Sequence, residues 1–309
     1  MPVAVERTDV IIAGVNKAGT TSLFVSLSTH PDVAPSSIKE TRYFLPPRSG
    51  EPLAPASVWE GYFAHAGGRA VHLEATPSYF YGAGAVASAM RDRLVNPHVL
   101  VVLREPVSRA VSFFTYQKVR LRFPADYPIE DYLAAADRLG PDDFRDPDNE
   151  RYMAYRGGCY ADFLPAWLDV FGTERLHVLD FQQLVSAPAD TLRATAVDLG
   201  LDPGRFPADA LSSENRTTGF KSRTLQRVAL TGNDRLERLL RRHPEAKRAL
   251  RSWYYRLNGR TAEESIPDPV RAELAARYVE PNARLTRQLD DAGITRPAFL
   301  TAAARDQTS

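Results

Sequence analysis

The sequence has little cysteine, little lysine and almost no net charge. Its one cysteine, Cys159, excludes an internal disulfide and any metal site built from several cysteines. A formal net charge of +1 at pH 7 argues against a nucleic-acid-binding protein and against a membrane-surface protein. Only five of the 39 basic residues are lysines, so each lysine stands out against an arginine-rich background.

Long apolar runs are also missing. No stretch reaches the roughly 18 apolar residues of a membrane-spanning helix, and the N-terminal segment lacks the basic region and apolar core of a signal peptide. We therefore expect no membrane span and a cytoplasmic location. With 309 residues, of which 44% are hydrophobic, the chain is long enough for one large α/β domain with a substantial core.

Short apolar runs alternate with helical patterns along the chain. Buried strands are predicted at 10–13, 70–74, 98–103 and 176–179. Helices are predicted after residue 19, near 107–120, near 159–171, over 220–265 and over 267–292. This alternation predicts an α/β fold with a central parallel sheet flanked by helices. We expect a single domain over 1–309, with its core at about 8–292.

The junction of the first strand and its helix predicts an anion-binding loop. Gly14 and Gly19 have the G-x-x-x-x-G spacing of a P-loop, in which backbone N–H groups and the helix dipole face a phosphate. Thr20, however, replaces the P-loop lysine, and Lys17 stands three positions earlier. A nucleoside triphosphate requires that lysine and Mg²⁺, whereas a sulfuryl group linked to one phosphate carries less charge and favours a cation at the bridging oxygen.

Residues 14–23, Gly-Val-Asn-Lys-Ala-Gly-Thr-Thr-Ser-Leu, resemble the 5′-phosphosulfate loop of sulfotransferases that use 3′-phosphoadenosine 5′-phosphosulfate (PAPS). The match is to the bacterial and heparan-type branch of that family. It implies a P-loop-like sulfotransferase fold, PAPS as donor, 3′-phosphoadenosine 5′-phosphate (PAP) as product, and no metal. By this resemblance Lys17 contacts the transferring sulfuryl group. The 5′-phosphate is assigned to the stretch Ala18, Gly19, Thr20, Thr21 and Ser22.

Residues 103–112 resemble the family's 3′-phosphate motif, R-x-P-x-x-R-x-x-S. Arg104 follows a strand at its carboxyl end, where open α/β sheets bind ligands, and its planar guanidinium suits phosphate oxygens. The resemblance implies that Arg104 and Ser112 bind the 3′-phosphate and that Arg109 is structural. Residues 215–223 resemble the later loop that closes over the 3′-phosphate and adenine. The clamp is assigned to Lys221, Ser222 and Arg223, although relatives have a glycine where Ser222 stands.

Three residues are candidates for the general base. Glu40 lies in a segment similar to the heparan-type K-E-x-x-F-F, whose glutamate is the base, and its alternative is a surface pair with Lys39 or Arg42. Glu74 begins a segment similar to E-K-T/S-P-x-Y-F, in which Ala75 replaces the lysine of heparan-type enzymes. That loss argues against a heparan-like polyanionic acceptor. His72, on the same strand face as Glu74, is the third candidate, and a lone strand histidine is more often structural.

The acceptor is expected to contact the segments that the resemblance leaves unmatched, 46–68, 121–150 and 230–265. The region 121–150 is rich in Pro and Asp and predicts a surface loop or lid. Aromatic residues in these segments favour an apolar small molecule or glycoside, as in natural-product biosynthesis: Trp59, Tyr62, Phe63, Phe123, Tyr127 and Tyr132. A hydroxyl acceptor is favoured over an amine. The alternatives are a nucleotide-dependent kinase with a variant P-loop and a non-catalytic nucleotide-binding module.

Overall fold

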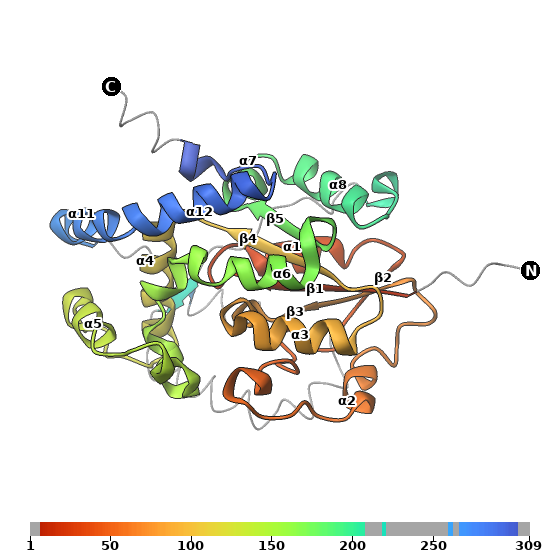
Figure 1. The fold of residues 1–309 in the computed structure, drawn as a ribbon, viewed down its shortest axis with the longest axis horizontal. Coiled ribbons are helices and arrows are strands. Elements are labelled where there is room, and N and C mark those ends of the chain that lie inside the picture. Colours follow the sequence, from red (N-terminus) through yellow and green to blue (C-terminus); the bar gives the residue numbers. More distant parts are fainter. Residues whose placement is uncertain (1–6, 208–217, 221–258, 262–265, 302–309) are drawn as a thin grey trace, which may run out of the picture.

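A five-stranded sheet forms the centre of the protein. The computed structural model describes residues 7–207, 218–220, 259–261 and 266–301 (Figure 1). The strands are β1 (Thr8–Gly14), β2 (Val33–Pro35), β3 (Val71–Ala75), β4 (His98–Leu103) and β5 (Leu176–Asp180). Their order is β2-β3-β1-β4-β5 and every neighbouring pair is parallel. The α/β class with a parallel sheet, expected from the sequence, is confirmed.

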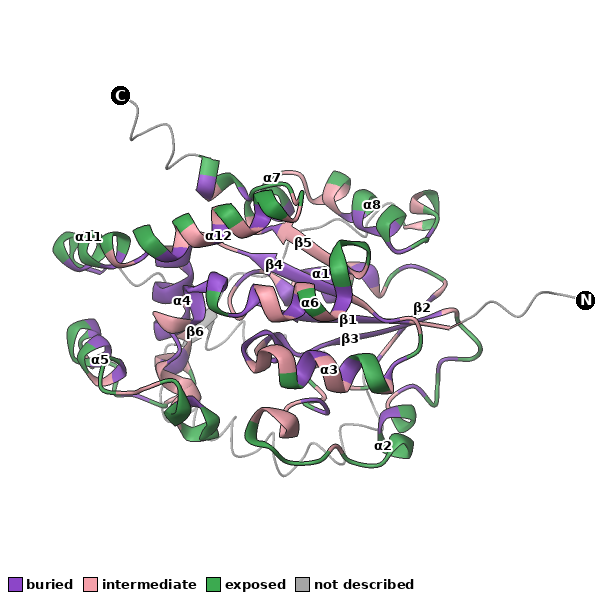
Figure 2. Ribbon diagram, in the orientation of Figure 1, coloured by how far each residue is buried: buried purple, intermediate pink, exposed green. Residues whose placement is uncertain are grey.

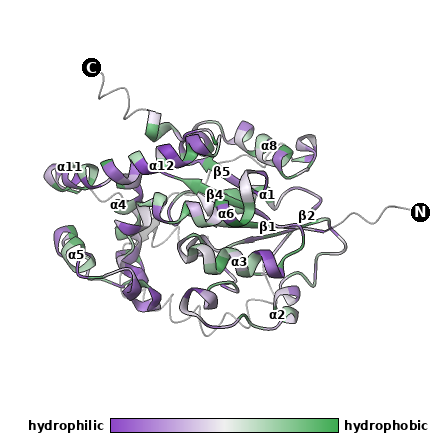
Figure 3. Ribbon diagram, viewed as in Figure 1, coloured by the Kyte–Doolittle hydropathy of each residue, from purple (hydrophilic) through white to green (hydrophobic). Residues whose placement is uncertain are grey.

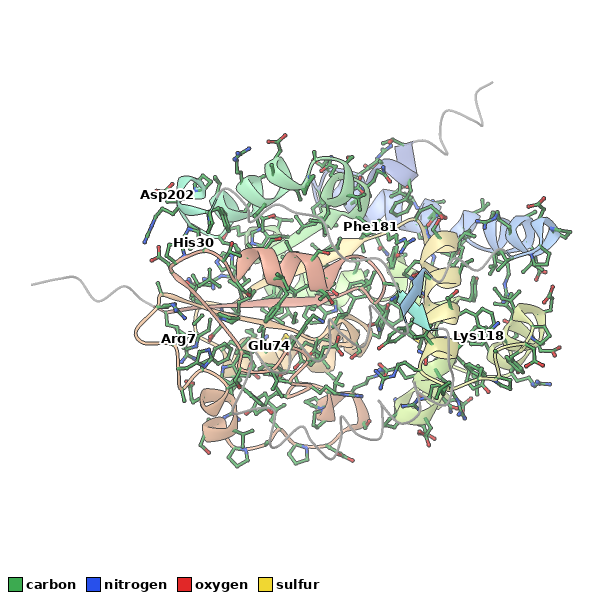
Figure 4. All side chains as sticks on the ribbon, turned by 180° about the vertical axis from the view of Figure 1, so that it is seen from behind. Arg7, His30, Glu74, Lys118, Phe181 and Asp202 are labelled. Carbon is green, nitrogen blue, oxygen red and sulfur yellow. The ribbon has the colours of Figure 1, made fainter. Side chains whose placement is uncertain are left out.

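Helices cover both faces of this sheet. Figures 1 and 4 show α3 (Ala83–Arg93) and α6 (Leu164–Arg175) on one face, and α1 (Thr20–Leu27) and α8 (Pro188–Asp198) on the other. The strands are apolar runs that are buried between these layers (Figures 2 and 3). Burial on both sides explains why β1 and β4 are continuous apolar runs without alternation. The indole nitrogen of Trp167 on α6 donates to the carbonyl of Phe80, 3.0 Å away, within this core.

The remaining elements surround the carboxyl edge and the ends of the sheet. The other described helices are α2 (Ala56–Gly61), α4 (Pro106–Val119), α5 (Ile129–Ala136), α7 (Phe181–Ser186), α11 (Asp268–Arg277) and α12 (Val279–Asp291). Short 3-10 turns occupy Pro46–Ser49, Pro77–Gly82, Asp142–Arg145, Pro147–Tyr152, Arg156–Gly158, Tyr160–Asp162 and Pro203–Arg205. Strand β6 (Thr218–Phe220) pairs antiparallel with β7 (Gly259–Thr261).

Several predicted boundaries are wrong, each for a local reason. The helix expected over 159–171 begins at Leu164, because Pro165 suits a first helical turn. The segment 267–292 forms two helices that meet at Tyr278, since Pro281 cannot continue the preceding helix. Residues 259–261 form a strand where a helix was expected, and 121–150 contains α5. Most of 230–265 lies outside the described residues, and the single-domain organisation stays a prediction.

The strand order identifies one edge of the sheet as the place for a ligand. β1 lies between β3 and β4: the chain leaves β1 through α1 toward β2 on one side, and it passes from β3 through α3 to β4 on the other side. Open α/β sheets bind ligands in the crevice at the carboxyl ends of the strands, where the connections diverge. The loop that follows β1 and the residue that follows β4 both lie at this edge.

Candidate functional site

The loop after β1 requires glycine at both ends. A Cβ on Gly14 would lie 2.7 Å from the Cβ of Phe80, too close for any side chain. Gly19 has φ +76°, and a Cβ there would lie 3.1 Å from a methyl of Leu184. Helix α1 begins directly afterwards at Thr20, so the N–H groups of its first turn have no partners within the helix. This loop therefore offers backbone donors and the positive end of a helix to an anion.

Lys17 lies in this loop with its backbone in the left-handed region, φ 71°. Its ammonium nitrogen lies 4.5 Å from the centre of the Tyr116 ring, a cation–π contact. Burial, and next the positive charge of Arg104, lowers the pKa of Lys17 from 10.5 to about 8, while Glu40 opposes that shift. The structure thus brings Lys17, Arg104 and Glu40 within electrostatic reach of one another. At neutral pH the lysine keeps its proton and remains a partly desolvated cation.

Arg104 joins the loop to the end of β4. Its guanidinium donates to the carbonyl of Lys17 at 2.8 Å and lies 4.6 Å from the centre of the Phe181 ring. The next residue, Glu105, caps α4 by accepting from the N–H groups of Val107 and Ser108 at 2.8 and 2.7 Å. Arg104 is therefore held between a strand end and a helix start; its ring partner Phe181 is labelled in Figure 4.

Of the other residues assigned to the 3′-phosphate, Ser112 lies within the described part of the chain. Ser112 is half-buried on α4, one turn before Tyr116, and the i, i+4 spacing places both on the helix face that meets the Lys17 loop. Lys221, Ser222 and Arg223 lie outside the described residues. Ser22, which was assigned to the 5′-phosphate, lies in the first turn of α1 and is half-buried.

Arg109 is a structural anchor, as its place in the motif suggested. It is fully buried and donates to the carbonyls of Met153, at 3.0 Å, and of Ala154. Its other terminal nitrogen lies 3.5 Å from the carbonyl of Asn16, in the phosphate-loop candidate. A Cβ on Gly157 would lie 3.0 Å from this guanidinium. Arg109 thus ties residues 153–157 to the loop after β1.

Glu40 lies on the segment that faces Lys17 across a cleft. Its φ is 65°, its N–H donates to the carbonyl of Ala75 at 2.9 Å, and its side chain is 51% exposed. The Lys39 ammonium lies 2.8 Å from its carboxylate. Glu40 is therefore held by its backbone at the end of β3 while its carboxylate stays open to a ligand.

Glu74, labelled in Figure 4, is fully buried. One carboxylate oxygen accepts from the N–H of Thr41 at 3.0 Å, from its hydroxyl at 3.1 Å and from the hydroxyl of Thr76 at 2.6 Å. Burial raises the pKa of Glu74 from 4.5 to about 7, and the hydrogen bonds from Thr76 and Thr41 limit that rise. Glu74 therefore holds the residue that follows Glu40 and has no surface of its own.

His72 is not brought together with Lys17 and Glu40. Its ring stacks on Phe63, with centroids 4.3 Å apart, and lies 3.7 Å from Asp9. It precedes Glu74 by two residues, about 7 Å farther from the carboxyl edge of the sheet. Burial lowers the pKa of His72 to about 4. These are the properties of a neutral core histidine.

A half-open cleft runs from the Lys17 loop to the end of α4. Its lining residues are Asn16, Glu40, Arg42, Ser78, Phe113, Tyr116, Gln117, Arg120, Arg122, Pro147, Glu150 and Arg151. The aromatic residues expected to contact an acceptor are not among them. Four belong to the core, with exposures of 0–7%: Trp59, Phe63, Phe123 and Tyr132. The expectation is wrong for these four rings, which are more strongly stabilised by burial than by lining an open cleft, whereas Tyr62 and Tyr127 are half-buried.

Sequence reasoning missed Arg120, Arg122 and Arg151 in this cleft, and it missed Phe181, whose ring contacts Arg104. Arg120 and Arg122 flank Leu121 directly after α4, and Arg151 lies in the turn Pro147–Tyr152. Arg120 and Arg122 could not be placed from the sequence, because the 14 residues of α4 separate them by about 20 Å from the phosphate motif at the start of that helix. Phe181 carried no signal either, since its contact depends on where β5 ends.

The comparisons with known proteins agree with this geometry. No family model matches the chain. Mouse heparan sulfate glucosamine 3-O-sulfotransferase 3A1 is 32% identical over 216 residues, which are 68% of this chain and 49% of that protein. Mouse heparan sulfate glucosamine 3-O-sulfotransferase 6 is 30% identical over 210 residues, 68% of this chain and 56% of that protein. The chain thus spans about half the length of these relatives.

Among solved structures, a sulfotransferase from Alicyclobacillus acidocaldarius superposes with a TM-score of 0.59 at 23% identity, over 76% of this chain and 95% of that one. The fold is therefore the P-loop-like fold of sulfotransferases. Together with the sequence relatives, it places the chain in the sulfotransferase family, which confirms the resemblance carried by the motifs. Within the described residues, no helix is long and apolar enough to cross a membrane.

Proposed function

We propose that the chain is an enzyme that transfers a sulfuryl group from PAPS to a hydroxyl of a small-molecule or glycoside acceptor. The observation that carries this proposal is the position of Lys17. It is a desolvated cation in a glycine-bounded loop, bonded to Arg104 through its carbonyl and facing Glu40. That arrangement offers a cation to a leaving oxygen and a carboxylate to an attacking hydroxyl.

The donor would be held by charges at both of its phosphate ends. The N–H groups of residues 18–21 and the N-terminus of α1 would bind the 5′-phosphate. Gly19 supports this assignment, because a side chain there would crowd Leu184 and disturb the cradle. Arg104 and Ser112 would bind the 3′-phosphate, and residues 221–223 are proposed to complete the clamp.

Glu40 would accept the proton of the acceptor hydroxyl while Lys17 stabilises the charge that develops on the bridging oxygen. The S–O bond to the acceptor forms as the S–O bond to the 5′-phosphate breaks, and PAP is the leaving group. Lys17 and the N-terminus of α1 would supply the positive charge at the bridging oxygen, so the proposed step includes no metal ion. PAPS supplies the activated sulfuryl group when bound.

Glu74 is a weaker candidate for the base than Glu40. It is completely buried, and one of its oxygens already accepts three hydrogen bonds from Thr41 and Thr76. A base must come within hydrogen-bond reach of the proton it removes. We therefore assign Glu74 to positioning Glu40, and His72 to the core.

Transfer of labelled sulfate from PAPS to a panel of hydroxyl acceptors tests the proposal. Lys17→Ala should lower kcat by about 10²–10³-fold and weaken PAP binding much less, because the cation acts mainly on developing charge. The remote surface variant Arg193→Ala serves as the control. An unchanged kcat in Lys17→Ala would overturn the mechanism.

Calorimetry separates the alternatives. A kinase with a variant P-loop would bind ATP with Mg²⁺ more tightly than PAP. A non-catalytic module would bind PAP but transfer sulfate to no acceptor in the panel.

A further inference from the structure

The ammonium of Lys17 is held by an aromatic ring and not by a carboxylate. In the part of the chain that the structure describes, no carboxylate lies within ion-pair distance of this ammonium and it donates no hydrogen bond. Its contact there is with Tyr116, whose ring centre lies 4.5 Å from the nitrogen. Glu40, across the cleft, pairs with Lys39 at 2.8 Å.

Helix α4 fixes the position of the Tyr116 ring. Arg109, Ser112 and Tyr116 are spaced at i, i+3 and i+7, so they share one face of the helix. On this face Arg109 lies 3.5 Å from the carbonyl of Asn16, and Tyr116 meets the next residue of the loop, Lys17. The hydroxyl of Tyr116 accepts from the guanidinium of Arg120 at 3.0 Å. The ring is therefore held at its backbone end and at its hydroxyl end.

A ring holds a cation in a different way from a carboxylate. The face of an aromatic ring attracts an ammonium group through its quadrupole, but the ring carries no net charge. A carboxylate in the same place would neutralise Lys17 and would repel the anionic phosphosulfate of the donor. A ring stabilises the protonated lysine and leaves its N–H groups to bind the oxygens of the donor.

We propose that Tyr116 is a positioning residue for sulfuryl transfer, whose ring holds the Lys17 ammonium in place and keeps it charged for the bridging oxygen. The part of this inference that concerns transfer rests on the proposed function, whereas the contact between ring and ammonium is a property of the protein alone. Tyr116 does not exchange a proton or form a bond in the step. It acts through Lys17.

The charged groups around Lys17 make this support necessary. Arg104 faces it from the end of β4, and Lys39 and Glu40 face it from the segment after β2. Burial, and next the charges of Arg104 and Lys39, lowers the pKa of Lys17 to about 8, while Glu40 raises it. A cation–π contact favours the protonated form and so opposes the loss of the proton.

Lysine NMR measures the contact without any sulfate transfer. The chain has only five lysines, so labelling with carbon-13 lysine gives few signals, and Lys17→Arg identifies the signal of Lys17. In the wild type and in Tyr116→Phe, the ring should shift the ε-proton signal of Lys17 to lower frequency. In Tyr116→Leu this shift should vanish, and the pKa of Lys17 should fall by about 0.4–1.5, as expected for the loss of a cation–π contact. Lys118, which lies 4.9 Å from the centre of the Phe114 ring on the same helix, is the internal control and should keep its signal.

Steady-state kinetics test the consequence for transfer. Tyr116→Leu should lower kcat about 2–30-fold, with KM for PAPS and the affinity for PAP nearly unchanged. Activity that needs protonated Lys17 is lost as the pH rises through the pKa of that residue. The basic limb of the pH profile of kcat should therefore move to lower pH in Tyr116→Leu and return in Tyr116→Phe. A merely structural tyrosine would not move this limb.

The outcomes are distinct. An unchanged or higher pKa of Lys17 in Tyr116→Leu would overturn the inference. Equal losses in Tyr116→Phe and Tyr116→Leu would also overturn it, because the effect would then belong to the hydroxyl and Arg120. Thermal unfolding and PAP binding show that each variant is folded, and Tyr116→Met replaces Tyr116→Leu if the latter does not fold. Failure of the proposed function has a different signature: the protein would transfer no sulfate, while the lysine signals would still report the ring contact.

Discussion

The buried carboxyl of Glu74 makes a prediction that separates positioning from catalysis. Glu74→Gln keeps the shape of the side chain and an oxygen that can accept from Thr41 and Thr76, but it cannot ionise. If Glu74 only holds the Glu40 segment, kcat should change by less than about tenfold. A general base would lose about 10²–10⁴-fold on the same substitution.

The effect on stability can be worked out from the same residue. Because the folded protein raises the pKa of Glu74 from 4.5 to about 7, the neutral form contributes stability that is complete below pH 4.5. That contribution is lost as the pH rises through 7. At about 1.4 kcal/mol per pH unit, the free energy of unfolding of the wild type should fall by about 3 kcal/mol relative to Glu74→Gln between pH 4.5 and pH 8.

Urea denaturation at pH 4.5, 6 and 8 measures this difference. Replacing the carboxyl by an amide also changes the free energy of unfolding by an amount that does not depend on pH. This amount cancels, because the comparison uses only how the difference between the two proteins changes with pH. Glu40→Gln is the control, since a half-exposed carboxylate paired with Lys39 contributes less than about 1 kcal/mol. Curves for wild type and Glu74→Gln that run parallel with pH would refute the reasoning, because Glu74 would then ionise alike in both states.

Three further predictions concern the loop, the end of β4 and the far edge of the sheet. Gly19→Ala should cost about 1–3 kcal/mol and weaken PAP binding in calorimetry, because its φ is +76° and Leu184 leaves little room. Arg104→Lys should weaken binding of PAP about tenfold or more but barely affect adenosine 5′-phosphosulfate, which lacks the 3′-phosphate; equal losses would exclude a 3′-phosphate contact. His98 and His177 lie 3.0 Å apart, and burial lowers the pKa of both, that of His98 to about 4. The neutral histidines therefore contribute stability above pH 6.5 that is lost as the pH falls toward 4. The stability of His98→Gln in urea titrations should fall less with acid than that of the wild type. Equal sensitivity to acid would contradict this assignment.

The sheet and the donor loop were predictable from the sequence because their signals are local. Apolar runs at 10–13 and 98–103 mark strands that are buried on both faces, and glycines fix the loop between β1 and α1. The short strand β2 was missed, because Val33–Pro35 has only three residues and no alternation. Register and pairing order depend on contacts between distant segments, which a single sequence does not reveal.

The acceptor side could not be predicted, because burial decides it. Trp59 and Tyr132 are aromatic residues of the kind that line binding surfaces, but both are buried in the core. Glu74 and Glu40 both lie in family-like motifs. Only the three-dimensional structure shows that the carboxyl of Glu74 is buried and that of Glu40 is exposed. Exposure depends on packing from residues far away in the sequence, so the same glutamate motif is compatible with either role.

The backbone itself gives the last argument for where the chemistry lies. Among the described residues, six non-glycine residues have positive φ: Glu40 and Arg42 line the cleft, and Lys17 and Leu121 are chain neighbours of residues that line it. Each such conformation costs about 1–3 kcal/mol and persists only where the surroundings fix it. Around Glu40 they do so through the Ala75 carbonyl and the Glu74 carboxyl, and around Lys17 through Arg104. Strain gathered around one cleft, and stabilised there by buried hydrogen bonds, is explained if those backbone positions orient the Lys17 cation and the Glu40 carboxylate toward one ligand. If Arg42→Gly and Leu121→Gly each stabilise the fold yet lower sulfate transfer, the strain serves this orientation; if both leave transfer unchanged, it does not.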